Sequence, residues 1–269
     1  MIHLARRGAI EYLEDAGLAA HPFLTHGFCT RRGGVSEGPF ASLNTGEQVG
    51  DRAKDVRRNL SAIGEAFAIP EGRLVLMQQV HGDRIEVIDD NGCPADPVPE
   101  CDGLVTDCPG VALAVKTADC VPILFADPVR RAIGVAHAGW RGTALGIAGK
   151  LARLFQERYS SRLEDLLVAI GPAIGPCCYQ VDGPVREAFA ARPEASRLLR
   201  PCPEQAGRWR LDLPLANRLE LTALGIPTEN ISLAGQCTAC RTDLFFSHRA
   251  EQGRTGRQIS FLMAAGKNA

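Results

Sequence analysis

Three segments of the chain carry side chains that could do chemistry together: QQVHGD around His81, TADCVPILFAD around Cys120 and VAHAGWRGT around His137. Two imidazoles and one thiolate are ligands that Zn²⁺ accepts readily, and three protein ligands leave its fourth position open for water or substrate. A water molecule there becomes a usable nucleophile, because the metal lowers its pKa towards about 7. The competing interpretation is structural, since a single Cys in an apolar run most often packs in the core.

A predicted hairpin brings two of these residues together. The tetrapeptide 127–130 (DPVR) suits a turn, with Asp at its first position and Pro at its second. If the turn is centred in the middle of this tetrapeptide, Cys120 lies directly opposite His137. Opposed Cβ atoms are about 4.5–5.5 Å apart, so both side chains could reach one metal ion. Two features argue against this register: Pro122 interrupts the first strand, and type I turns are not favoured in two-residue hairpins.

Four further residues are candidates for the same site. Arg141 stands at an expected helix start, where a guanidinium and free N–H groups could bind phosphate, although a surface Arg is the alternative. Arg31 and Arg32 precede two glycines, which would let the backbone approach a ligand or simply form a turn. Asp119 precedes Cys120 and would point to the opposite face of a strand. It could orient a ligand, or act as a base if the strand has already ended.

The elements that must position these residues follow from the hydrophobic pattern. Helices are predicted over 52–67, with Asp51 as N-cap, and over 142–159 and 213–224. Strands are predicted over 74–78, 84–88, 104–106, 111–116, 121–125, 132–136 and 166–170, and near Ile231 and Ile259. Helices and strands alternate irregularly, which favours an α+β fold of mixed β-sheets layered with outer helices, in a single domain spanning 1–269.

Composition narrows the function classes. The 269 residues are 45% hydrophobic and 23% charged, as in an ordinary globular protein. A net charge of -1 argues against a nucleic-acid coat or a surface that binds anionic membranes. The N-terminal residues lack a signal core, and no apolar run approaches the ~20 residues of a membrane span. We therefore expect a cytoplasmic protein with reduced thiols, no nucleic-acid or membrane partner and no obligate protein partner.

The ten cysteines form no regular framework. Cys237 and Cys240 make a single C-x-x-C with no second pair at zinc-finger spacing, so a zinc finger is not expected. A redox motif would need a thioredoxin-like setting, which the pattern does not indicate. Cys177 and Cys178 are adjacent and are interpreted as packing residues.

Seven segments together resemble the YfiH/laccase-domain family: FCTRRGGVSEGPFASLNTG, QQVHGD, TADCVPILFAD, VAHAGWRGT, IGPAIGPCCYQVD, LDLPLANRLEL and FFSHR followed by TGRQ. The resemblance runs in order from about Phe28 to Met263. It implies a zinc site on His81, Cys120 and His137, and it suggests a pocket role for Asn44. It also implies a YfiH-like single domain that phosphorolyses adenosine, inosine, guanosine and methylthioadenosine and deaminates adenosine.

Three hypotheses remain. The leading one is a zinc-dependent purine nucleoside phosphorylase, with nucleosides and phosphate as partners and phosphate near Arg141 or the 31–34 loop. The second is a copper polyphenol oxidase, which six His in total make less favourable, because a multicopper relay needs roughly two or three His for each of about four ions. The third is a cysteine hydrolase, with Cys120 as nucleophile and His137 as base. Whether the family's role is nucleoside salvage or peptidoglycan editing is left open.

Overall fold

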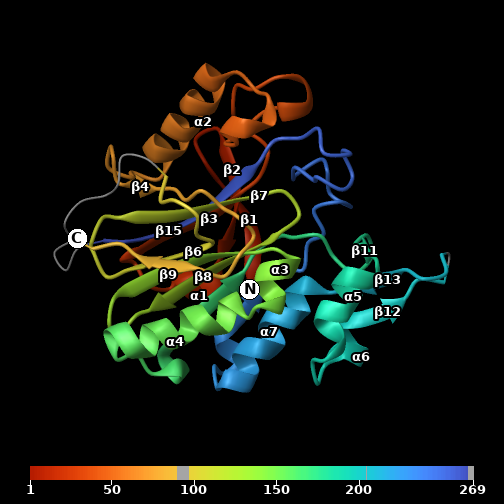
Figure 1. Cartoon of the computed structure of the whole chain (residues 1–269). Coiled ribbons are helices and arrows are strands. Elements are labelled where there is room, and N and C mark those ends of the chain that lie inside the picture. Colours follow the sequence, from red (N-terminus) through yellow and green to blue (C-terminus); the bar gives the residue numbers. More distant parts are fainter. Residues whose placement is uncertain (90–96, 204, 266–269) are drawn as a thin grey trace.

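The computed structural model describes residues 1–89, 97–203 and 205–265 and has four layers. Two six-stranded sheets lie face to face in the middle, helix α2 covers the outer face of the first, and helices α4 and α7 cover the outer face of the second (Figure 1). This arrangement confirms the predicted α+β class of mixed sheets with helices outside.

The first sheet has the strand order β1-β2-β3-β15-β7-β4. All neighbours in it are antiparallel except β4 and β7. The last strand along the chain therefore lies in the middle of the sheet. The strands are β1 (Ile2–Arg7), β2 (Ile10–Asp15), β3 (Leu24–Cys29), β15 (Gln258–Ala264), β7 (Ala112–Thr117) and β4 (Leu74–Val75).

The second sheet has the order β14-β10-β8-β9-β6-β5 and carries part of the candidate site. Every residue of its two central strands, β8 and β9, is buried, because the other sheet covers one face and helices cover the other. The strands are β14 (Ile231–Leu233), β10 (Leu167–Ile170), β8 (Val121–Asp127), β9 (Ala132–Ala138), β6 (Gly103–Thr106) and β5 (Ile85–Val87).

Three apolar clusters hold the layers together. Between the sheets, Leu262 of β15 and Leu124 of β8 belong to one fully buried cluster. Ile63 of α2 (Ala53–Ala66) packs on the outer face of the first sheet. Leu151 of α4 (Ile147–Tyr159) and Leu221 of α7 (Leu213–Leu224) pack on the outer face of the second. Within 1–89, 97–203 and 205–265, no helix combines the length and apolarity that a membrane span requires.

The remaining elements are short. A small sheet at one end of the molecule has the order β11-β13-β12 (Figure 1). Its strands are β11 (Gln180–Val181), β12 (Leu199–Pro201) and β13 (Trp209–Leu211), and the other helices are α1 (Ala16–Ala19), α3 (Trp140–Ala144), α5 (Gly183–Ala190) and α6 (Ala195–Leu198). Single 3₁₀ turns lie at Gly38–Phe40, Glu47–Val49, Leu163–Asp165 and Thr228–Asn230.

Two predicted helices differ from the observed ones, the first in its N-cap and the second by an interruption. The helix predicted over 52–67 forms as α2, but Arg52 is its N-cap, and the Asp51 carboxylate accepts a hydrogen bond from the N–H of Arg52 instead. The helix predicted over 142–159 is two helices, because Gly146 has a left-handed φ of 78° that separates α3 from α4. The helix predicted over 213–224 is confirmed as α7.

The predicted register of the β8–β9 hairpin is wrong by two residues. His137 pairs with Pro122, not with Cys120. The turn takes four residues, 128–131, because the Asp127 carboxylate accepts two backbone N–H groups inside it and the Asp127 carbonyl accepts the N–H of Arg131. A shift by two residues does not exchange the faces of a strand, and the donor atoms of Cys120, which directly precedes β8, and of His137 still lie within 4.8 Å of each other.

Candidate metal centre and its pocket

The three predicted ligands converge. One donor atom each from His81, Cys120 and His137 lies within 4.8 Å of the other two. His137 belongs to β9, Cys120 directly precedes β8, and His81 lies in the loop between β4 and β5. The two imidazole rings meet edge to face, with centroids 4.8 Å apart. One strand, the residue before a second strand and one loop therefore deliver a compact set of two nitrogens and one sulfur.

Asp102 links the two histidines and is fully buried. Its Oδ1 lies 2.7 Å from Nδ1 of His137, and its two oxygens accept the backbone N–H groups of Val80, His81 and Gly82 at 3.2, 3.0 and 2.7 Å. The carboxylate keeps the proton of His137 on Nδ1, which leaves Nε2 free for a ligand bond. It also holds His81 in a left-handed conformation, φ 60°, that costs a non-glycine residue free energy. Sequence reasoning missed Asp102.

Electrostatics couple Cys120 to His137. Burial alone would raise the pKa of the Cys120 thiol, but the charge and hydrogen bonds of His137 and His81 outweigh burial and lower it to about 6. Burial would lower the pKa of His137, whereas the Cys120 thiolate and Asp102 raise it to about 9. Each of the two groups thus favours the charged form of the other. A thiolate is the form that binds metals and attacks electrophiles.

Two neighbouring groups shape the surroundings of the ligands. A Cβ at Gly139 would lie 3.0 Å from the His81 ring and 3.2 Å from the Cys120 sulfur, so the main chain passes against both side chains. The Gln79 amide accepts the N–H of Lys116 and donates to its carbonyl, both at 2.8 Å. This pair of bonds fastens the loop that carries His81 to strand β7.

The ligands open into a pocket of about 930 Å³. Its wall contains the aromatic side chains of Trp140 and Tyr179. It also contains four cationic side chains, of which sequence reasoning singled out only the first: Arg141, Lys116, Arg249 and Arg257. Burial lowers the pKa of the Lys116 ammonium group, although Glu47 partly offsets the effect. The combination suits an anionic group next to a flat, apolar one.

Asp119 lies in the pocket wall but outside the strand, with φ 88°. Its Oδ1 accepts hydrogen bonds from the hydroxyls of Thr238 and Ser247 at 2.6 and 2.7 Å, and its Oδ2 accepts the N–H of Arg249 at 2.7 Å. These contacts hold the distant 238–249 segment beside Cys120. The arrangement is that of a positioning residue.

The structure does not bring Arg31 and Arg32 into the pocket wall. The Arg31 guanidinium donates to the carbonyls of Ala41 and Thr242 and to the Glu251 carboxylate. The Arg32 guanidinium donates to the Asp243 carbonyl at 3.0 Å and lies 3.3 Å from a Glu11 carboxylate oxygen. Both therefore hold surface segments together.

Asn44 does not line the pocket but contacts residues that do. Its buried side-chain oxygen accepts the N–H of Gly46 and of Arg257, at 2.9 and 2.8 Å. Gly46 and Arg257 both line the pocket, so Asn44 positions part of the wall.

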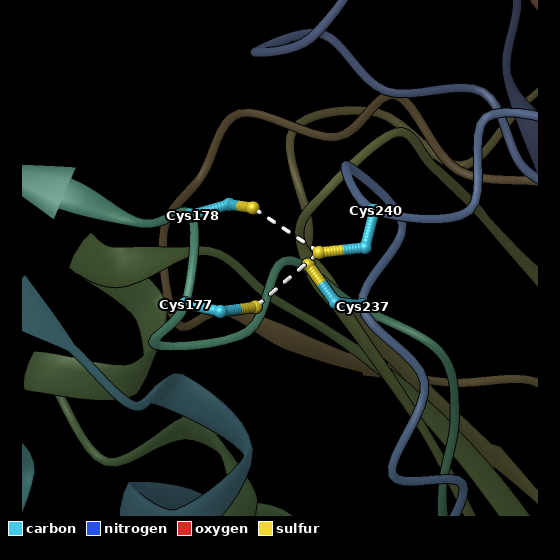
Figure 2. Close-up of side chains that lie close together, drawn as sticks. All are labelled: Cys177, Cys178, Cys237 and Cys240. Atoms are coloured by element: carbon cyan, nitrogen blue, oxygen red, sulfur yellow. Dashed lines mark hydrogen bonds between the residues drawn. The ribbon is translucent and has the colours of Figure 1, made fainter.

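The interpretation of Cys177 and Cys178 as packing residues is wrong. Cys177 is exposed and Cys178 only partly buried, and both meet Cys237 and Cys240, which come from a segment about sixty residues later (Figure 2). The four sulfurs gather outside the pocket described above.

Sequence and fold both resemble those of known proteins. Residues 25–265 match the family described as multi-copper polyphenol oxidoreductase laccase. The purine nucleoside phosphorylase YlmD of Geobacillus stearothermophilus is 48% identical over 244 residues, 88% of each chain. Its counterpart in Bacillus subtilis is 40% identical over 242 residues, 88% of this chain and 87% of that one. The crystal structure of the Geobacillus stearothermophilus YlmD gives a TM-score of 0.90 at 42% identity, covering 97% of this chain and 98% of that one.

Proposed function

The chain belongs to the multi-copper polyphenol oxidoreductase laccase family, and from this premise we propose that it is a zinc-dependent purine nucleoside phosphorylase of the cytoplasm. One observation carries the proposal: His81, Cys120 and His137 converge in a pocket that four cationic side chains also line. Relatives that bear the name purine nucleoside phosphorylase support it, because they match 88% of the chain at 48% and 40% identity.

The ligand set fits zinc. Two imidazole nitrogens and one thiolate are ordinary Zn²⁺ ligands, and Asp102 leaves Nε2 of His137 free. When bound, zinc supplies Lewis-acid polarisation of an oxygen and a water of lowered pKa. Copper accepts the same residues, but a multicopper relay needs many more imidazoles than the six of this chain.

The contacts of the four cationic side chains favour two of them as phosphate ligands. The guanidinium groups of Arg249 and Arg257 donate to backbone carbonyls. Arg141 instead stacks on the ring of Trp140 at 4.4 Å, and Lys116 uses only its main chain to bond Gln79. We assign phosphate to Arg141 and Lys116. A phosphate oxygen then forms a bond to ribose C1′ while the bond from C1′ to the purine nitrogen breaks, and the purine leaves with a proton.

The proposed substrates of phosphorolysis are adenosine, inosine, guanosine and methylthioadenosine. The second proposed activity is deamination of adenosine, in which water replaces the amino group at purine C6 and ammonia leaves. A pocket of about 930 Å³ is in the range that holds a small ligand, so a nucleoside and phosphate fit together. The aromatic walls at Trp140 and Tyr179 suit a purine face.

The first experiment measures metal and activity on the same sample. Zinc and copper are quantified in the purified protein, which is then incubated with adenosine with and without phosphate, and the products are separated. We expect adenine and ribose 1-phosphate only with phosphate, and inosine without it. Cys120→Ala should lose the pocket metal and both activities, whereas Cys108→Ala, buried away from the pocket, should keep them. Metal-bearing protein that leaves adenosine intact would contradict the proposal.

The phosphate assignment has its own variant. Arg141→Gln should raise KM for phosphate about tenfold or more, with a smaller change in KM for adenosine, because one charged hydrogen bond to phosphate is lost. Arg58→Gln, on the exposed side of α2, is the matched control and should change neither KM. Equal rises in the KM for phosphate and the KM for adenosine would show that Arg141 does not act on phosphate alone and would contradict the assignment.

A cysteine hydrolase is the second candidate, because the lowered pKa of Cys120 and the raised pKa of His137 describe an activated nucleophile and its base. Reaction with iodoacetamide separates the two functions. A metal-bound Cys120 should resist alkylation until a chelator is added, whereas a free nucleophile should react at once. An acyl adduct on Cys120 after incubation with an ester would favour the hydrolase.

A further inference from the structure

Four cysteines from two distant segments gather at the surface. Cys177 and Cys178 lie between β10 and β11, and Cys237 and Cys240 lie between β14 and β15. The side chains of both pairs point toward one another (Figure 2). The Cys240 sulfur is 3.5 Å from that of Cys177 and 3.3 Å from that of Cys178, and all four sulfurs lie within 4.8 Å of one another.

We propose that Cys177, Cys178, Cys237 and Cys240 form a second metal site, which binds one Zn²⁺ through four thiolates and has a structural role. None of the four lines the pocket that contains Cys120. The site is therefore separate from the one assigned to catalysis, and the inference holds whether or not the chain is a phosphorylase.

The spacing of the sulfurs fits this ion. Zinc–sulfur bonds of about 2.3 Å in a tetrahedron place neighbouring sulfurs about 3.8 Å apart. The distances from the Cys240 sulfur to those of Cys178 and Cys177, 3.3 and 3.5 Å, lie below that value, and the limit of 4.8 Å for all pairs lies above it. A disulfide requires about 2.05 Å between its sulfurs, which is far shorter than either contact.

A hydrogen bond to one of the sulfurs and the exposure of the cluster also fit a bound cation. The backbone N–H of Gly175 donates to the Cys237 sulfur at 3.2 Å, as outer hydrogen bonds to metal-bound sulfur do. Four sulfur ligands leave no open position on zinc, which is the pattern of structural sites. Cys177 and Cys240 are exposed, so an ion can reach the cluster from solvent and the displaced thiol protons can leave.

An ion at this site would join two walls of the pocket. Tyr179, next to Cys178, lines the pocket, and Thr238, next to Cys237, donates to the Asp119 carboxylate. One short parallel bridge, Ala173 with Cys237, already pairs the two segments. Four metal–sulfur bonds would fasten the segments far more firmly than that bridge and the hydrogen bonds around it.

Zinc counting on paired variants tests the proposal. Untagged protein should hold about two Zn²⁺ per chain, Cys120→Ser about one, the double variant Cys177→Ser/Cys240→Ser about one, and the triple variant none. Cys108→Ser, a buried cysteine at neither site, is the matched control and should keep two. A double variant with the zinc content of the unaltered protein would overturn the second site.

A spectroscopic measurement keeps the test decisive if the double variant does not fold. Cys120→Ser protein, stripped and reloaded with Co²⁺, should show the strong absorption of tetrahedral cobalt bound only by sulfur. Its four cluster thiols should become reactive to a thiol reagent only after a chelator is added. Absence of that absorption would overturn the proposal. An intact mass that is lower by two hydrogens, and that reductant restores, would also overturn it, because the cluster would then hold a disulfide instead of a metal ion.

The two proposals fail separately. Loss of phosphorolysis in Cys120→Ser with the cobalt spectrum intact would leave the second site standing. Full activity with only one zinc per chain, located at Cys120, would leave the proposed function standing and remove the second site.

Discussion

Asp102 contacts two of the three candidate ligands, one through its imidazole and one through its backbone N–H. We expect Asp102→Asn to weaken zinc binding at this site about 10–100-fold, because an amide holds the Nδ1 proton of His137 less strongly than a carboxylate. Chelator competition measures the change. Asp127→Asn is the matched control, since Asp127 is also buried and accepts two backbone N–H groups, but in the turn between β8 and β9, away from the ligands. Equal losses in both variants would contradict a specific role for Asp102.

His26 makes stability depend on pH. Burial lowers its pKa from 6.5 to about 4, although the carboxylates of Asp15 and Glu14 act in the opposite direction. Its neutral Nε2 accepts the N–H of Asp15 at 2.9 Å. Above pH 6.5 the side chain is neutral in both states. Between pH 6.5 and 4 only the unfolded chain takes up the proton, so the free energy of unfolding should fall by about 3 kcal/mol.

Urea unfolding at several pH values checks this effect. His26→Gln retains an acceptor without a titrating ring, so it should lose most of the slope between pH 6.5 and 4. The exposed His3 serves for comparison, and His3→Gln should retain the slope. An unchanged slope in His26→Gln would assign the acid sensitivity to other groups.

At the scale of elements, local signals explain which parts of the fold the sequence predicts. The bounds of α7 follow from an Asp212 carboxylate that accepts the N–H of Leu215 and from Gly225, whose φ of 109° ends the helix. The hairpin of β8 and β9 is also local, yet its register depends on a turn two residues longer than the tetrapeptide suggests. The hydrophobic pattern cannot distinguish the two registers, because a shift of two keeps every face.

Non-local contacts explain what the sequence could not predict. The three ligands were named from their types and from a family resemblance, whereas Asp102 has no pattern of its own and meets His137 only through the pairing of β6 and β9. Cys177 and Cys240 are 63 positions apart, and neither pair of cysteines alone has the spacing of a complete site. Lys116 and Arg257 reach the pocket from two strands of the first sheet or their ends.

The junction of β9 and α3 offers a test of how closely the site is packed. Gly139→Ala would place a methyl group 3.0 Å from His81 and 3.2 Å from the Cys120 sulfur, so a ligand must move by a few tenths of an ångström. We expect zinc affinity at that site to fall on the order of tenfold, with little loss of fold stability. Gly64→Ala, in α2 with only a 3.9 Å contact, should leave affinity unchanged and stabilise the fold slightly. Equal affinities in the two variants would contradict this packing.

At the scale of the whole molecule, the apolar layer between the sheets is what joins them. Leu262→Ala removes a fully buried side chain from that layer and should lower the free energy of unfolding by about 2–5 kcal/mol. Leu4→Ala, on the exposed edge strand β1, should cost well under 1 kcal/mol. Denaturant midpoints of the two variants measure the difference. Similar midpoints would show that the apolar layer between the sheets contributes little to the stability of the fold.

The central place of β15 in the first sheet sets an order of events during synthesis. Its neighbour β3 leaves the ribosome more than two hundred residues earlier, and at about 5–20 residues per second that is a delay of roughly ten to forty seconds. The core of the second sheet, β6, β8, β9 and β10, emerges within a far shorter stretch of chain. Until β15 emerges, β3 and β7 therefore lack the strand that pairs with both of them, and their unpaired edges are open to other chains.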